Sequence, residues 1–96
     1  MSDLDDLLTA TLNQDWPEMY PSVWAAVLSF KENCTRDELT SAHDELAAVL
    51  ARGLTEHQLR YDIMRDVYET GYRPAGDGMT VTEFLILLEV ELRPGP

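Results

Sequence analysis

Apolar residues recur at helical spacing along most of the chain, and the alternation typical of strands is nearly absent. The first run predicts a helix with acidic residues in its first turn, where the helix dipole favours negative charge. Its apolar positions are Leu4, Leu7, Leu8 and Leu12. We expect this helix to end at Trp16-Pro17, because a residue before proline is disfavoured in helical geometry. A second helix is expected over residues 21–32.

Three later helices each begin with a capping box, in which a hydroxyl side chain and an acid or amide three residues on satisfy free backbone N–H groups of the first turn. An apolar run at helical spacing follows each box, and the boxes begin at Thr35, Thr55 and Thr80. Gly53 and Gly71 stand where the third and fourth helices are expected to stop, in the left-handed position that glycine favours.

Helical projection separates the inner faces of the third and fourth helices from their outer faces. The inner stripe expected on the third helix consists of Leu39, Ala42, Leu46, Val49 and Leu50. The inner stripe expected on the fourth helix consists of Leu59, Ile63 and Val67. A lateral stripe on the fourth helix, which core packing or partner binding would explain, consists of Tyr61, Met64 and Tyr68.

The fifth helix is apolar on most of its sides. Its core face is expected to consist of Val81, Phe84, Leu85, Leu88 and Leu92. Three further apolar residues point elsewhere, namely Ile86, Leu87 and Val90. Because a helix that is apolar on most sides is usually central in its fold, we expect its neighbours to sandwich it, in preference to a dimer face.

These patterns predict an all-α fold, a single compact bundle of about five short helices that forms one domain over residues 1–96. The one longer loop, residues 72–79, precedes the last helix and contains the turn signal Asp77-Gly78. A short two-stranded hairpin within this loop remains an alternative. No repeat and no second domain is apparent.

Charge limits the partners that the chain is expected to bind. The sequence has 7 Lys and Arg against 18 Asp and Glu, a formal net charge of −11. The cations are scattered singly along the sequence, so we expect neither nucleic acid nor an anionic membrane as a partner. The composition favours a cationic partner, or solubility alone.

Catalytic and metal chemistry is not apparent in the sequence. Cys34 is the only cysteine, which excludes an internal disulfide and favours a reducing compartment. Nothing in the sequence indicates that His43 or His57 forms a catalytic pair with Cys34. A calcium loop aligned on Gly78 lacks the required oxygen ligands, and no zinc or phosphate-binding spacing occurs. We therefore expect no catalytic residue, no cofactor and no metal, and hence no enzyme.

Targeting signals are also not apparent. The N-terminus is acidic where a signal peptide needs a positive start. The longest apolar run, residues 84–88, is far too short to span a bilayer. We expect a cytoplasmic protein.

The acidic residues of the fourth helix are the first candidate for a partner-binding surface. Three carboxylates follow at i, i+4 and i+7, namely Asp62, Asp66 and Glu69. Tyr61 and Tyr68 are candidate aromatic anchors beside them. The outer side of the third helix, with Asp37 and Asp44, is the second candidate. For each candidate surface, the alternative is that the acidic residues only face solvent and bind no partner.

Three short elements, in matching order and spacing, give the chain a resemblance to a known family. The first is Q-D-W at residues 14–16, and the second is E-L followed by L-x-x-G within residues 45–53. The third runs from Tyr72 to Leu85 as Y-x-P, D-G and T-x-x-E-F-L. Over roughly residues 10–92 the chain resembles the immunity proteins of bacterial contact-dependent growth inhibition systems. It departs from the family pattern at Asn13, where His is commoner, and at Phe84, where Trp is favoured.

The resemblance implies a small helical protein that binds the C-terminal domain of a toxin, often a nuclease, and blocks its active site. Because no long exposed apolar seam is apparent, we expect a monomer, which would form a 1:1 heterodimer with the toxin domain, and the acidic charge favours a basic toxin domain. The family positions are Asp15, Trp16, Glu45, Leu46, Gly53, Tyr72 and Gly78, which we interpret as determinants of the fold and not as toxin contacts. We expect Trp16 to anchor the first loop, and Asp15 and Glu45 to cap or to pair, for instance with Arg52.

Two other classes of protein remain as alternatives. An acyl carrier protein is also small, acidic and helical, but Asp37-Glu38-Leu39 lacks the serine that carries the prosthetic arm. An acidic adaptor, or an inhibitor of some other basic protein, differs from an immunity protein only in its partner. The sequence does not separate that last alternative from immunity, nor does it identify the toxin or its substrate.

Overall fold

The computed structural model describes residues 2–94. Its elements in chain order are α1 (Asp3–Asp5), η1 (Asp6–Thr11), α2 (Trp16–Met19), α3 (Val23–Glu32), α4 (Arg36–Ala51), α5 (Glu56–Gln58), η2 (Leu59–Arg65), η3 (Pro74–Asp77) and α6 (Val81–Leu92). The segments η1 and η2 are π-helical continuations of α1 and α5, and η3 is a 3₁₀ turn. No strand occurs between Ser2 and Pro94, so the all-α prediction is confirmed, and η3 occupies the loop where a hairpin was the alternative.

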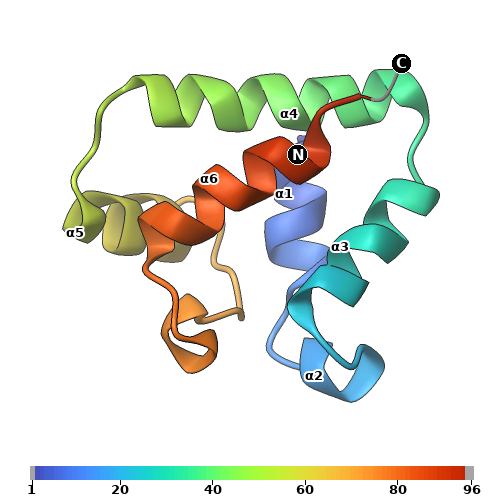
Figure 1. The fold of residues 1–96 in the computed structure, drawn as a ribbon, viewed down its shortest axis with the longest axis horizontal. Helices are drawn as coiled ribbons and strands as arrows, with labels where there is room; N and C mark the ends of the chain where they lie inside the picture. Colours follow the sequence, from blue (N-terminus) through green and yellow to red (C-terminus); the bar gives the residue numbers. More distant parts are fainter. Residues whose placement is uncertain (1, 95–96) are drawn as a thin grey trace.

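The helices pack around the N-terminal one. Figure 1 shows α4 lying across one side of the molecule, with α6 crossing it and α1 placed centrally between α3 and α5. Helix α4 contacts both α6 and α1, and η1 contacts α3. The radius of gyration of 12.3 Å matches the value of about 12.5 Å expected for a compact chain of this length.

The two most apolar helices supply the centre of the core. Four leucines of the first helical segment are fully buried, namely Leu4, Leu7, Leu8 and Leu12. The predicted core face of α6 is buried in full, from Val81 at 4% exposed to Phe84 and Leu88 at 0%. Burial of this many large side chains is the main term that holds so small a domain together.

All three predicted capping boxes are present. The Thr35 hydroxyl accepts a hydrogen bond from the Glu38 N–H (3.1 Å), and the Glu38 carboxylate accepts one from the Thr35 N–H (2.8 Å). The boxes at Thr55 and Thr80 repeat this geometry at the starts of α5 and α6. Each box satisfies backbone N–H groups that the helix itself leaves free, which sets where these helices begin.

The prediction that Trp16-Pro17 ends the first helix was wrong. That helix ends at Thr11, where the Leu12 N–H donates to the Leu7 carbonyl (2.9 Å), and Trp16-Pro17 instead begins α2. Proline is favoured in the first turn of a helix because its missing N–H would have no partner there. The second predicted helix is confirmed as α3, with Ser22 as its N-cap.

The fourth helix ends earlier than its apolar pattern indicates. It stops at Arg65, so Val67, predicted to lie on the inner stripe, is in the turn beyond and is 58% exposed. The chain reverses through Glu69, which adopts a left-handed φ of +50°. The backbone of the turn is held by the first helix, because the Thr9 hydroxyl donates to the Tyr68 carbonyl.

The two glycines predicted to stop helices differ in their roles. Gly53 has a φ of +66° after α4, as predicted. Gly71 does not stop a helix; its N–H donates to the Leu12 carbonyl (2.7 Å), and a Cβ at this position would lie 2.4 Å from the carbonyl carbon of Asn13. Gly71 is therefore required by the close approach of two backbones and not by a left-handed turn.

Helix α6 is not sandwiched by its neighbours, contrary to the prediction. Ile86, Leu87 and Val90 are 51%, 47% and 50% exposed. The N-terminal helix takes the central place instead, since its four leucines are all fully buried. The outer face of α6 is consequently an apolar surface open to solvent.

Candidate partner-binding surface

The carboxylates predicted to bind a partner are all exposed. Asp62, Asp66 and Glu69 are exposed, but they do not share one helical face, because the helix ends at Arg65. Asp66 accepts a hydrogen bond from Nε of Arg65 (2.9 Å), which partly offsets its charge. The three acids therefore form an acidic edge along η2 and the turn that follows it.

The two candidate aromatic anchors have different environments. Tyr61 is half-buried; the Arg65 guanidinium lies 4.9 Å from the centre of its ring, and the His57 ring lies 4.7 Å away. Tyr68 is only 6% exposed, and its hydroxyl donates to the Glu45 carboxylate. Tyr68 is thus part of the core, so of the two only Tyr61 presents a ring to a partner.

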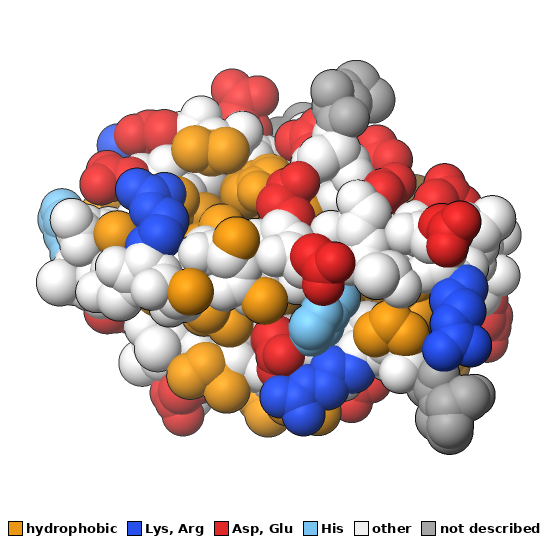
Figure 2. All heavy atoms as spheres, turned by 90° about the horizontal axis from the view of Figure 1, so that it is seen from above, with side chains coloured by type: hydrophobic (Ala, Val, Ile, Leu, Met, Phe, Trp, Pro, Cys, Tyr) orange, Lys and Arg blue, Asp and Glu red, His pale blue; other side chains and the backbone are white. Residues whose placement is uncertain are grey.

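The second candidate surface lies on α4, where Asp37 and Asp44 are exposed. Figure 2 views the molecule from the side of α4 and shows acidic side chains spread over much of this face, with apolar side chains between them. Asp44 lies 3.4 Å from Nδ1 of His43, whose other ring nitrogen is 2.8 Å from the Glu89 carboxylate. These groups join the outer side of α4 to α6.

Three of the family positions, Trp16, Tyr72 and Gly78, lie at or near the loop before α6 and its packing. Trp16 packs edge-on against Tyr72 (5.4 Å between ring centres), and Tyr72 packs against the buried Phe84 (4.7 Å). The Tyr72 hydroxyl donates to Asp77 (2.7 Å), just before Gly78, which has a φ of +75°. Burial, reinforced by the hydrogen bond to Asp77 and its charge, raises the pKa of Tyr72 well above its ordinary value.

Glu45 does not pair with Arg52. Its carboxylate accepts hydrogen bonds from the Tyr68 hydroxyl and from the Ser2 hydroxyl (2.8 Å), so it ties α4 to the N-terminus and to the turn after η2. Burial and this contact raise the pKa of Tyr68 well above its ordinary value. The Asp15 side chain forms no cap hydrogen bond at α2, although Asp15 is the N-cap residue.

Glu56 makes a contact that the sequence did not indicate. Its carboxylate accepts hydrogen bonds from the backbone N–H groups of Val81 and Thr82 (2.8 Å each) and from the Thr82 hydroxyl (2.7 Å). Burial alone would raise the pKa of Glu56, but these bonds and the neighbouring Arg60 outweigh it and lower the pKa. Glu56 therefore caps α6 from another helix. Because Glu56 and Val81 are 25 residues apart in the chain, patterns among neighbouring residues do not indicate this contact.

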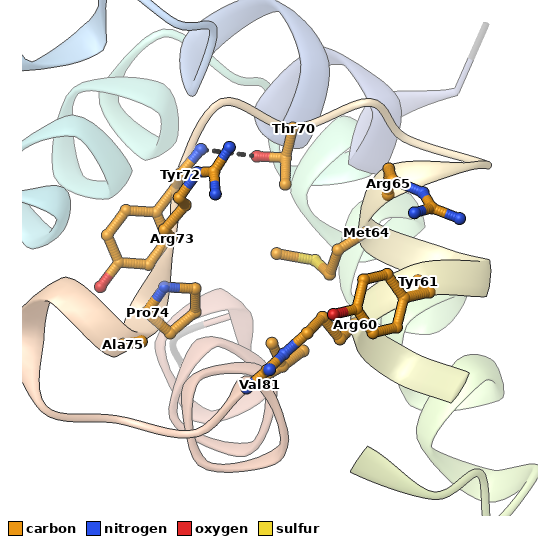
Figure 3. Close-up of a pocket in the computed structure, with 10 residues that line it drawn as sticks. All are labelled: Arg60, Tyr61, Met64, Arg65, Thr70, Tyr72, Arg73, Pro74, Ala75 and Val81. Atoms are coloured by element: carbon orange, nitrogen blue, oxygen red, sulfur yellow. Dashed lines mark hydrogen bonds between the residues drawn. The ribbon is translucent and has the colours of Figure 1, made fainter. Parts of the chain in front are cut away.

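A cleft of about 280 Å³ lies between η2 and residues 70–75. Figure 3 shows Tyr72 to Ala75 on one side of it and Tyr61 to Arg65 on the other. Its apolar lining includes Met64, Tyr72 and Val81. Arg60, Arg65 and Arg73 also line it, so three of the seven cations that look scattered in the sequence border one cleft.

Residues 2–94 contain neither a membrane-spanning helix nor a metal-binding cluster. No helix in this range is long and apolar enough to cross a membrane. Within the same range, no group of three or more His, Cys, Asp or Glu residues is placed to hold a metal ion. The surfaces described above are the acidic edge, the α4 face, the apolar side of α6 and the arginine-lined cleft.

The chain is similar to known proteins in sequence and in fold. A family model described as CdiI immunity protein matches residues 1–92. In fold, the chain is similar to a chain of the crystal structure of a CdiA-CT/CdiI complex from Y. kristensenii 33638, with a TM-score of 0.85 and 21% sequence identity over 95% of this chain and 96% of that one. No curated protein matches. Since the family model spans nearly the whole chain, this protein belongs to the CdiI immunity protein family.

Proposed function

We propose that this protein binds and neutralises the C-terminal toxin domain of a contact-dependent growth inhibition system. The match of the CdiI family model over residues 1–92 carries the proposal. The similar fold comes from a CdiA-CT/CdiI complex, which is a toxin domain with its immunity protein. Neutralisation by binding alone requires exposed surface and no catalytic group, and the described surface offers several faces of that kind.

We further propose that the toxin is basic and is a nuclease whose active site this protein covers. A nuclease holds phosphates with cationic side chains, and an acidic surface can occupy the same place. The formal net charge of −11 supports this mode, because opposite charges steer two proteins together and raise the rate of association.

The acidic edge is the surface that we propose for this contact. Asp62, Asp66 and Glu69 are exposed there, and Tyr61 stands beside them as the aromatic contact. The α4 face with Asp37 and Asp44 is the second choice. On this proposal the complex is a 1:1 heterodimer formed in the cytoplasm.

Growth rescue tests the function, and a charge reversal tests the surface. The toxin domain encoded beside this gene is co-expressed with the protein, and restored growth is expected. Reversing Asp62, Asp66 and Glu69 to Lys raises the formal charge from −11 to about −5. We expect calorimetry to show that this variant binds the toxin at least about a hundredfold more weakly.

The matched control reverses Glu32, Asp37 and Asp44, which are also exposed, and reaches the same net charge. A loss of similar size in both triple variants would mean that total charge matters and that the acidic edge does not. A loss confined to the control would assign the contact to the surface formed by Glu32 of α3 and by Asp37 and Asp44 of α4. Circular dichroism confirms that each variant remains folded. If the unmodified protein does not restore growth when it is co-expressed with the toxin domain, the immunity function itself is contradicted.

A further inference from the structure

The arginine-lined cleft is an exception on an acidic molecule. The chain has only 7 Lys and Arg, and Arg60, Arg65 and Arg73 line one cleft of about 280 Å³. The chain turns back after η2, which brings residues 60–65 and 70–75 to opposite sides of the cleft (Figure 3). A basic hollow in such a protein has no role in attracting a uniformly basic partner.

The guanidinium groups retain hydrogen-bonding capacity for a ligand. Arg73 is exposed and takes part in no ion pair within residues 2–94. Arg60 contacts Glu56 only at 3.4 Å, and the same carboxylate already accepts shorter bonds from the start of α6. Arg65 uses Nε on Asp66, which leaves its two terminal nitrogens free of that bond.

We propose that this cleft binds an acidic side chain, Asp or Glu, from the protein that the chain neutralises. The carboxylate would pair with the exposed Arg73, with Arg60 and Arg65 on the opposite side of the cleft (Figure 3). Guanidinium groups pair with carboxylates through two parallel hydrogen bonds, which fixes direction as well as affinity. This inference rests on the proposed function, since it concerns the same partner.

The surroundings of the cleft favour a single carboxylate over a nucleic acid. A strand of phosphates would run beyond the cleft onto a body with a net charge of −11, which repels it. One acidic residue within an otherwise basic partner meets no such penalty. Asp62 and Asp66 adjoin the cleft residues Tyr61 and Arg65, so the acidic edge and the cleft form one surface of mixed charge. When acidic and basic groups lie side by side on one surface, a partner with the complementary charges can bind in only one orientation.

Substitution of Arg73 tests the proposal, because this side chain forms no ion pair with any residue that the structure describes. Calorimetric titration with the neighbouring toxin domain is expected to show binding at least about tenfold weaker for Arg73→Glu and for Arg73→Gln. The control is Arg52→Glu, an exposed arginine outside the cleft that makes the same charge change. We expect the control to bind within about twofold of the unmodified protein.

A charge swap then identifies the acidic partner residue. Each Asp and Glu of the toxin surface is changed in turn to Arg, and one such variant is expected to restore binding to Arg73→Glu. Equal affinity of Arg73→Glu and the unmodified protein, or no restoring variant, would overturn the inference while the immunity function stands. Failure of the unmodified protein to bind the toxin would overturn both proposals. Binding of a single-stranded RNA oligonucleotide that Arg73→Glu abolishes would assign the cleft to phosphates and also overturn the inference.

Discussion

The cap that Glu56 provides for α6 leads to a quantitative prediction about stability. Replacing Glu56 with Ala removes three hydrogen bonds of 2.7–2.8 Å, two of them from backbone N–H groups in the first turn of α6. Removal of a single N-cap costs about 1 kcal/mol, and bonds to a charged acceptor are stronger than neutral ones. The Glu56 side chain is 35% exposed, so water partly replaces it. We expect a loss of about 2 kcal/mol in the free energy of unfolding.

Thermal and urea denaturation followed by circular dichroism measure this loss. For a domain of this size, about 2 kcal/mol corresponds to a fall of about 10 °C in melting temperature. Glu32→Ala is the matched control, because Glu32 is exposed and forms no ion pair in the described part of the chain, and it is expected to change stability by less than about 0.5 kcal/mol. If Glu56→Ala and Glu32→Ala were equally stable, the account of the α6 cap would be refuted.

The same contact gives this prediction a pH dependence. The pKa of Glu56 is lower in the folded protein than in the unfolded chain, since the bonds from Val81 and Thr82 favour the charged carboxylate. Its contribution is therefore present above the unfolded pKa of about 4.3 and is lost as the pH falls through the folded pKa. The stability difference between the unmodified protein and Glu56→Gln is expected to be fully present at about pH 7 and to shrink as the pH falls below about 4.3 and through the lowered folded pKa. A difference that stays constant over this range would contradict the assignment.

Two further substitutions test the packing around the turn after η2. Gly71→Ala places a Cβ 2.4 Å from the backbone of Asn13 and is expected to cost about 2 kcal/mol or more in unfolding free energy, whereas Gly76→Ala meets nothing within 4 Å and serves as its control. Tyr68→Phe removes the donor to the Glu45 carboxylate and is expected to cost about 1–2 kcal/mol by urea denaturation, with unchanged stability as the contrary result.

Sequence patterns predicted the features of the fold that depend on neighbours in the chain. The capping boxes at Thr35, Thr55 and Thr80 and the buried stripe of α6 could be read in advance, because each involves residues within one or two helical turns. The early end of the fourth helix at Arg65 could not. It depends on contacts between the turn and the first helix, such as that of Thr9 with Tyr68, which lie 59 residues apart.

The binding surface was predictable only in part, for the same reason. Exposure of Asp62, Asp66 and Glu69 follows from their polarity, but their placement on one helical face assumed a helix that continues past Arg65. The arginine-lined cleft exists only because the chain reverses direction at Glu69 and brings Arg73 back towards η2. Charges that are isolated along a sequence can become a site once such a turn is formed.

Titration of the toxin domain into this protein over a range of salt concentrations tests the central claim most directly. The account predicts a 1:1 complex whose affinity falls steeply as salt rises, because a surface with a net charge of −11 meets a basic partner. Absence of a complex, or an affinity that salt leaves unchanged, would contradict it.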